Sequence, residues 1–157
     1  MNGVSRITVY EDVALVTFHR APNDLKILAP IFTELAGAKV NLDMISQAAP
    51  QSHQTDISFT LRSEQLVEVL GLVNRFRETH ADLRPMVSNG NCKIELYGEE
   101  MQEMYGVASR AIAAVAKANA ELTLISTGEV EISLLVPQSC CDEAVKALEE
   151  AFGVKAG

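Results

Sequence analysis

The chain repeats its own pattern, and this repeat restricts the possible folds more than any other feature. Residues 40–47, VNLDMISQ, align with residues 120–127, AELTLIST. Further along, with an offset that is smaller by five, residues 55–61, TDISFTL, align with residues 130–136, VEISLLV. The five additional residues of the first copy fall within 48–54, AAPQSHQ, a polar segment typical of a long hairpin loop. The sequence therefore predicts two copies of one structural unit.

Each copy has the same order of secondary-structure signals. In the first copy, residue periodicity predicts two helices and four strands in the order β-α-β-β-α-β. The strands are expected at 13–18, 40–48, 54–62 and 82–87, and the helices at 25–37 and 64–80. The second copy is expected to contain strands at 93–98, 121–127 and 129–136 and helices at 104–119 and 140–152.

The second copy lacks a convincing fourth strand, whereas a surplus strand precedes the first copy. The last helix is followed only by FGVKAG, and SRITVYE at residues 5–11 reads as the surplus strand. An absent edge strand would leave backbone groups of the sheet unpaired. We therefore expect domains at 12–90 and 91–157, the second completed by residues 4–10.

Residues 41–47, NLDMISQ, alternate apolar and polar side chains as a half-buried strand does, and the strand is expected to be central. Asp43 and Gln47 are costly side chains at such a position. The alternation by itself does not explain why an acid and an amide occur there. A purely structural role, with both side chains hydrogen-bonding across a domain seam, remains open.

Composition and charge exclude several classes of function. The 157 residues are 48% hydrophobic with a net charge of −8, which indicates a globular chain that repels nucleic-acid phosphates and anionic membranes. At the N-terminus, Arg6, Glu11 and Asp12 interrupt any apolar run, so neither a signal-peptide core nor a membrane span is predicted. We expect a cytoplasmic protein with no nucleic-acid or membrane partner.

Catalytic and metal-binding patterns are missing from the sequence. It contains no P-loop, GxGxxG, HExxH or GxSxG motif. The cysteines have neither a paired framework nor metal-ligand spacing, and the histidines are scattered singly: Cys92, Cys140, Cys141, His19, His53 and His80. We therefore expect no catalytic residues, no metal site and no cofactor.

Two separated motifs resemble a known family. NLDMISQ at 41–47 with TDISFT at 55–60, and LISTGEVEISLLV at 124–136 with AVKALEEAFG at 144–153, are similar to the tandem ACT domains at the C-terminus of aspartokinases. The resemblance covers essentially the whole chain. It implies an α+β fold of two ferredoxin-like βαββαβ ACT domains, each with a four-stranded antiparallel sheet and its helices on one face.

The resemblance also implies a non-catalytic regulatory function in lysine and threonine biosynthesis. In that family, lysine or threonine binds at a seam where the loop after one domain's first strand faces another domain's second strand. The matching effector-binding positions in this sequence are Asn23, Asp24, Leu25, Lys26, Ile27, Asn41, Asp43, Met44, Ile45 and Gln47. An acid and an amide on a strand, with loop N–H groups, can satisfy the two charges of a free amino acid. For Asp56, exposure to solvent remains open.

Departures from the family pattern leave the effector undefined. The family's first loop usually reads Pro-Asp-Lys-Pro-Gly, whereas residues 22–26 read PNDLK, so that Lys26 replaces the glycine. In the second copy Gly106 is retained, but Glu121 and Thr123 replace the usual Asn and acidic positions. No nucleotide-binding motif of a kinase domain is present, so the chain itself is not expected to phosphorylate aspartate.

Two functions follow as alternatives. The first is an allosteric module that senses lysine, threonine or a related amino acid. The second is a ligand-free dimerisation or docking subunit for a separate aspartokinase catalytic chain. In either case, we expect a homodimer formed by ACT–ACT pairing, because self-association removes an exposed sheet edge. A chain that begins at Met1 fits a small regulatory subunit, a free-standing gene or part of a longer protein.

Overall fold

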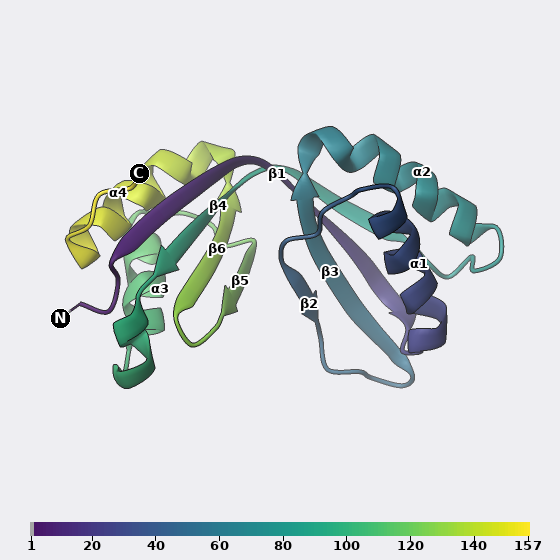
Figure 1. Ribbon diagram of the computed structural model, residues 1–157, viewed down its shortest axis with the longest axis horizontal. Coiled ribbons are helices and arrows are strands. Elements are labelled where there is room, and N and C mark those ends of the chain that lie inside the picture. Colours follow the sequence, from purple (N-terminus) through teal and green to yellow (C-terminus); the bar gives the residue numbers. More distant parts are fainter. Residues whose placement is uncertain (1) are drawn as a thin grey trace. The chain divides into compact units, whose positions relative to one another are not determined.

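The computed structural model describes residues 2–157, which form a mixed α/β fold with one antiparallel sheet and four α-helices (Figure 1). The strands are β1 (Arg6–Pro22), β2 (Ile45–Gln47), β3 (Gln54–Arg62), β4 (Pro85–Tyr97), β5 (Leu124–Thr127) and β6 (Glu131–Pro137). The helices are α1 (Leu25–Gly37), α2 (Leu66–Arg77), α3 (Val107–Lys117) and α4 (Cys141–Phe152), with short 3₁₀ helices η1 (Ser63–Gln65), η2 (Glu99–Glu103) and η3 (Gln138–Cys140). The strand order is β2-β3-β1-β4-β6-β5.

Two strands are longer than the sequence patterns predicted. The expected strands at 5–11 and 13–18 both overlap the 17-residue β1, and those at 82–87 and 93–98 both overlap the 13-residue β4, which begins only at Pro85. Asp12 in β1 and Gly90 in β4 have φ values of 55° and 70°. These left-handed residues interrupt the apolar and polar alternation, which explains why each strand appeared as two in the sequence.

The chain divides into two compact units. The continuous unit is Val13–Asn89, and the split unit combines the N-terminal residues through Asp12 with Gly90–Gly157. Strands β1 and β4 pass from one unit to the other at the two left-handed residues named above. The N-terminal strand therefore belongs, by its contacts, with the second half of the sequence.

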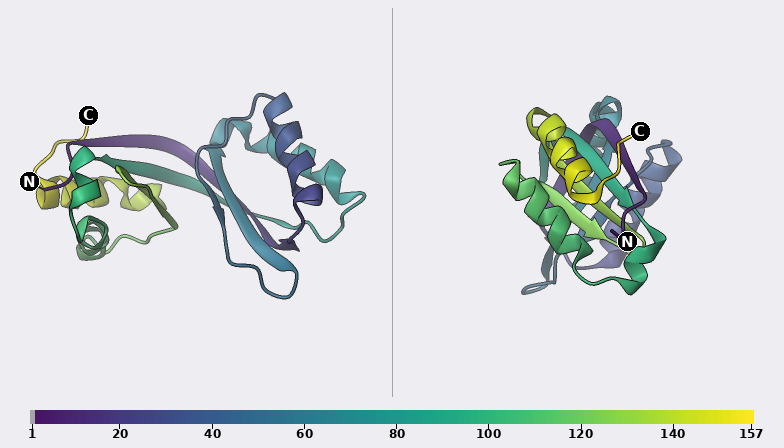
Figure 2. Two further views of the ribbon diagram at one scale, coloured as in Figure 1. Left: turned by 60° about the horizontal axis from the view of Figure 1, so that its bottom comes forward. Right: turned by 90° about the vertical axis from the view of Figure 1, so that its left-hand side faces the viewer.

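The core of the continuous unit lies between α1, α2 and one face of the strands, and Figure 2 shows both helices on the same side. Phe18 of β1 and Phe59 of β3 are fully buried, with ring centroids 5.8 Å apart. Phe32 of α1 contacts Phe59 edge to face at 5.7 Å. Because side chains alternate along a strand, the residues next to Phe18 and Phe59 point to the other face of the sheet.

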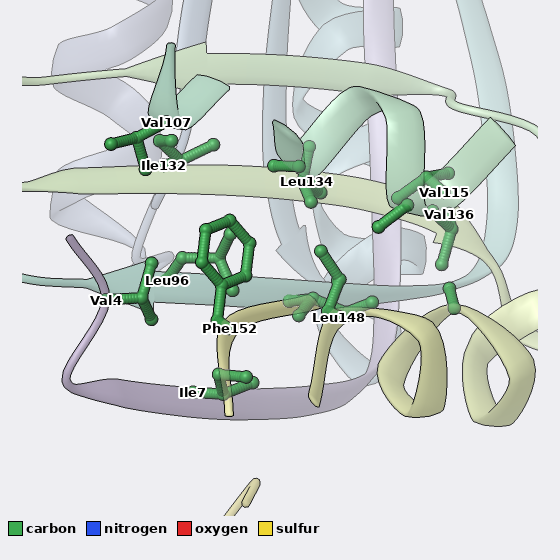
Figure 3. Close-up of a cluster of buried hydrophobic side chains, with 14 of the residues drawn as sticks. Val4, Ile7, Leu96, Val107, Val115, Ile132, Leu134, Val136, Leu148 and Phe152 are labelled. Atoms are coloured by element: carbon green, nitrogen blue, oxygen red, sulfur yellow. The ribbon is translucent and has the colours of Figure 1, made fainter. Parts of the chain in front are cut away.

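The core of the split unit joins the N-terminal strand to α3, α4 and the remaining strands (Figure 3). Val4 and Ile7 point toward Phe152 of α4 in this cluster. Backbone hydrogen bonds continue the attachment, because Ser5 N donates to Tyr97 O at 2.7 Å and Gly157 N donates to Ile7 O at 3.1 Å. A Cβ atom at Gly98 would lie 1.7 Å from Gly3 O, so only glycine allows the N-terminal segment to approach here.

The expectation that the cysteines are unpaired is wrong. Cys92 of β4 and Cys141, the first residue of α4, form a disulfide with their Cα atoms 6.3 Å apart. Both side chains are buried in the core of the split unit. Their separation of 49 residues gave no motif, because the fold rather than local spacing brings strand and helix together. Cys140 is free and half-buried.

The expectation that residues 41–47 form a central strand is also wrong. Strand β2 contains only Ile45–Gln47 and lies at the edge of the sheet, where it pairs with β3. The two residues before β2 contact β3 through single hydrogen bonds rather than through strand pairing. Asp43 N donates to Thr60 O at 3.1 Å, and Met44 N donates to Thr60 Oγ1 at 2.8 Å. At a sheet edge, polar side chains remain in contact with water and need no buried partner.

Candidate functional site

The first half of the candidate site is the segment that connects β1 to α1. Asn23 N donates to His53 O at 2.9 Å, which ties this segment to the β2–β3 loop. Asp24 is the N-cap of α1, and its Oδ1 accepts a hydrogen bond from Lys26 N at 2.9 Å. This cap explains why the sequence folds into a helix at Leu25.

The second half of the candidate site is β2, and one hydrogen bond joins it to the first half. Gln47 Nε2 donates to Asn23 Oδ1 at 3.4 Å. In the β2–β3 register, Ile45 pairs with Phe59 and Gln47 pairs with Ile57, so these side chains share the face that α1 covers. The fold therefore places these two segments beside each other within the continuous unit, whereas the resemblance implied a seam between two domains.

Most of the predicted effector-binding residues have exposed side chains, and two do not. Leu25 is 72% exposed and Ile45 is 56% exposed, although both side chains are large and apolar. Met44 is buried at 6% exposure, and Ile27 is half-buried. The remaining predicted residues have exposed side chains: Asn23, Asp24, Lys26, Asn41, Asp43 and Gln47.

A second polar arrangement lies on the opposite face of the same sheet. Asp56 Oδ1 accepts a hydrogen bond from Arg20 N at 2.8 Å and lies 2.9 Å from His19 Nδ1. The Arg20 N–H holds the pKa of Asp56 below its usual value, and His19 acts in the same direction against the opposing effect of partial burial. Asp56 precedes the core residue Ile57 in β3 and so points away from the core, and His19 contacts it from the stretch of β1 in which the register shifts between Phe18 and Ala21.

These groups border a hollow of about 390 Å³ beside the long β2–β3 loop, which Figure 1 shows connecting the two strands. The hollow is lined by His19, Arg20, Ala48, Ala49, Gln51, Ser52, Gln54, Thr55 and Asp56. Sequence reasoning missed it, because His19 was grouped with the scattered histidines and Asp56 was unassigned. The sequence signal that could have indicated the hollow is the β2–β3 loop, which is five residues longer than the corresponding loop of the second copy.

Two further classes of site are absent from the described part of the chain. Within residues 2–157, no group of three or more His, Cys, Asp or Glu side chains is arranged to hold a metal ion. Over the same residues, no helix combines the length and apolar character needed to cross a membrane.

Comparison with known proteins identifies the family of part of the chain. Residues 94–152 match the family model described as ACT domain. Over 152 residues, the chain is 31% identical to an aspartokinase of Bacillus sp. (strain MGA3), a match that covers 96% of this chain and 37% of that protein. An aspartokinase of Geobacillus stearothermophilus is 32% identical over 151 residues, with 36% of its length covered. The chain thus spans little more than a third of these relatives.

Solved structures agree with the sequence matches. Aspartate kinase from Synechocystis superposes with a TM-score of 0.91 at 26% identity, and the match covers 99% of this chain and 28% of that chain. The ligand-free regulatory subunit of aspartate kinase from Thermus thermophilus superposes with a TM-score of 0.84. That match covers 96% of this chain and 99% of the subunit, and its 24% identity shows a shared fold.

These comparisons confirm the resemblance that the sequence motifs indicated. The chain matches about 37% of the length of the Bacillus aspartokinase and nearly the whole length of the Thermus thermophilus regulatory subunit. Residues 94–152 therefore match the ACT domain family, and the chain is similar along nearly its whole length to part of aspartokinases and to a regulatory subunit of aspartate kinase.

Proposed function

We propose that this chain is a regulatory module that binds a free amino acid where the start of α1 meets β2. The two units would be two ferredoxin-like βαββαβ ACT domains, at 12–90 and 91–157, each with a four-stranded sheet. Burial of Val4 and Ile7 in the core of the split unit supports completion of the second domain by residues 4–10.

The observation that carries the proposal is the hydrogen bond between Gln47 and Asn23. It joins an amide on the edge strand to the loop before α1, and Asp43 adds a carboxylate near the start of the same strand. A ligand ammonium group can bind carbonyl and carboxylate oxygens of this set. The first turn of α1 includes Lys26, whose ammonium group can pair with a ligand carboxylate.

Lysine, threonine or a related amino acid is the proposed effector class, because the relatives of this chain are aspartokinases. A thermal-shift screen of the purified chain against the twenty amino acids tests this proposal. A ligand present at one hundred times its dissociation constant stabilises a protein by about 2.7 kcal/mol. For a chain of this size, the unfolding midpoint should rise by roughly 5–11 °C. If no amino acid shifts the midpoint, the sensing function is wrong.

Variants locate the binding site once an amino acid produces a shift. Gln47→Ala and Asp43→Ala should each abolish the shift while leaving the folded structure intact, because both side chains are exposed. Asp82→Ala provides the matched control, since Asp82 is an exposed aspartate in the loop before β4 of the same unit. Equal shifts in all three variants would place the amino acid elsewhere on the molecule.

A second candidate function, a ligand-free dimerisation or docking subunit for an aspartokinase catalytic chain, is favoured by a different observation. Leu25 and Ile45 expose large apolar side chains beside the unpaired edge of β2. Such an edge favours pairing with another strand, for example that of a second copy.

Sedimentation velocity tests this alternative, with Ile45→Glu expected to dissociate the dimer and Val67→Glu as the control. Val67 is also exposed and apolar, at 84%, but it lies on α2. A chain that is monomeric at all concentrations, or a dimer unaffected by Ile45→Glu, would contradict pairing through this edge.

A further inference from the structure

We propose that the hollow beside the β2–β3 loop is a second binding site, for a small organic anion that Arg20 and His19 hold. This site goes beyond the proposed amino-acid site, because it lies on the opposite face of the sheet. Gln47 faces the helices, whereas His19 and Asp56 face away from them.

Hydrogen bonds fix the polar groups of the hollow before any ligand binds. Asp56 Oδ1 accepts a hydrogen bond from the Arg20 backbone N–H and lies within hydrogen-bond distance of His19 Nδ1. These interactions orient both the Arg20 backbone and the His19 imidazole ring. Among the residues that the structure describes, the Arg20 guanidinium group makes no hydrogen bond or salt bridge, and its charge contributes only a minor part of the lowering of the Asp56 pKa. Its donors are therefore available to a ligand.

The backbone around the hollow adopts unfavourable conformations. Arg20, Ser52 and His53 have φ values of 53°, 51° and 68°. These values lie in the left-handed backbone region, which residues other than Gly and Asn rarely adopt. Ser52 and His53 are the central residues of a tight hairpin turn, in which Gln51 N donates to Gln54 O at 2.8 Å and Gln54 N donates to Gln51 O at 2.9 Å. Asn-Gly is the usual pair at such a turn. Unfavourable non-glycine conformations of this kind cluster at ligand-binding sites.

Charge and size determine the class of ligand. A guanidinium group binds carboxylate or phosphate with two parallel hydrogen bonds, and Gln51, Ser52 and Gln54 add neutral donors and acceptors. The volume of about 390 Å³ lies within the range of small-molecule sites and exceeds what one inorganic ion fills. The ligand is therefore a small organic molecule with a carboxylate or phosphate group. Because the net charge of −8 repels anions generally, their binding requires a local cationic site.

The split unit differs from the continuous unit at the sheet positions and the hairpin loop that correspond to the hollow. Phe18 pairs with Ile57 in one unit, and Leu96 pairs with Ile132 in the other. In the split unit, Glu131 therefore occupies the position of Asp56 and pairs in register with Tyr97, whereas His19 lies in the stretch of β1 where the register shifts. The β5–β6 connection is a short turn in which Gly128 N donates to Glu131 O at 2.8 Å. The split unit thus has neither the long loop nor an arginine at this position, which makes the proposed site specific to the continuous unit.

Amide NMR titration of the full chain tests the proposal, with inorganic phosphate and succinate as probes at constant ionic strength. We expect saturable shifts of Arg20 and of residues 48–56 with at least one probe. Succinate acting alone would identify a carboxylate ligand, and phosphate acting alone would identify a phosphorylated one. If neither probe produces saturable shifts there, or if the shifts spread over all arginines of the surface, the proposal is overturned.

A variant and its matched control give the second readout. Arg20→Asn should weaken probe binding at least tenfold, and asparagine tolerates the left-handed backbone at this position. Arg84→Asn removes the same charge from an exposed loop of the same unit and should leave the affinity unchanged. Equal affinities of the Arg20→Asn variant and the unaltered chain would overturn the proposal.

The same variants separate this proposal from the amino-acid site. Arg20→Asn should retain any amino-acid-induced thermal shift, and Gln47→Ala should retain anion binding. Loss of anion binding in Gln47→Ala would show that the two ligands share one site, which contradicts a separate anion site.

Discussion

Both units pack two α-helices against strands, but the strand that closes the continuous unit comes last in it, whereas the split unit receives its additional strand from the N-terminus, and the ends of the two units are held differently. In the split unit, a disulfide joins β4 to α4, and Arg110 donates hydrogen bonds of 3.0 Å to both Asn2 O and Ala151 O. In the continuous unit, an aromatic cluster fills the core, while left-handed residues and a polar hollow occur at the loop end of the sheet. The comparison teaches that a disulfide and side-chain hydrogen bonds hold the ends of the split unit, whereas the continuous unit contains the features expected of ligand recognition.

The starts of the first helix in each unit show the same difference. Helix α1 begins at Leu25 with the Asp24 side chain as its cap, so Lys26 lies inside the first turn. Helix α3 begins after Gly106, which has a φ of 83° and no side-chain cap. A glycine is needed at the second start and not at the first, which explains how the first unit can have Lys26 where the family has glycine.

The largest effect expected from the comparison is the loss of the split unit after deletion of residues 1–10. The deletion removes Val4 and Ile7 from the core, and complete burial of each side chain contributes about 1.5–3 kcal/mol. It also leaves one edge of β4 unpaired. Hydrogen exchange followed by mass spectrometry should show lost protection across 90–157 and retained protection across 13–89. Unchanged protection across 90–157 would contradict the described attachment of the N-terminal strand.

Reduction of the disulfide should have the next largest effect, again confined to the split unit. A cross-link between residues 49 apart stabilises a fold mainly by restricting the unfolded chain, by about 2–4 kcal/mol. Denaturant unfolding with and without dithiothreitol measures this difference. A double variant with Cys92→Ala and Cys141→Ala should be insensitive to dithiothreitol, whereas Cys140→Ala should respond as the unaltered chain does. If alkylation of the unreduced protein labels all three cysteines, no disulfide is present.

A smaller and opposite effect is expected from the hairpin turn of the continuous unit. Changing Ser52→Asn together with His53→Gly supplies the residues that a left-handed turn favours, so the free energy of unfolding should rise by about 1 kcal/mol. Denaturant unfolding measures the change, and Ser52→Ala alone should give no increase. A loss of stability in the Asn-Gly variant would show that the Ser52 and His53 side chains contribute more than their backbone conformation costs.

The smallest expected effect is a change in the pH dependence of stability. Because the Arg20 N–H and His19 lower the pKa of Asp56 in the folded state, the ionised carboxylate stabilises the fold above the unfolded-state pKa of about 3.9. This stabilisation is lost as the pH falls through the lower folded-state pKa. Asp56→Asn should flatten that part of the acid unfolding profile, and His19→Gln should flatten it partly, since the Arg20 N–H remains. An unaltered profile in Asp56→Asn would contradict the lowered pKa.

Some parts of the fold and of the candidate site could be predicted from sequence, and others could not. The four α-helices lie within the predicted helical segments, because apolar residues recur at helical spacing over many positions. Asn23 and Gln47 were both predicted as site residues through the resemblance, and the structure shows them in contact. The hollow was missed because the sequence places His19 and Asp56 in different strands, and only the β1–β3 register makes them neighbours.

The sequence by itself determined the repeat, the order of helices and strands, and the similarity to the ACT-domain region of aspartokinases. These are properties of neighbouring residues and of residue order, so they can be read along the chain. Tertiary structure decided that β2 lies at an edge, that Cys92 meets Cys141, and that Arg20, His19 and Asp56 border one hollow. Strand register and helix packing produce these arrangements, because they bring together residues that local periodicity does not relate.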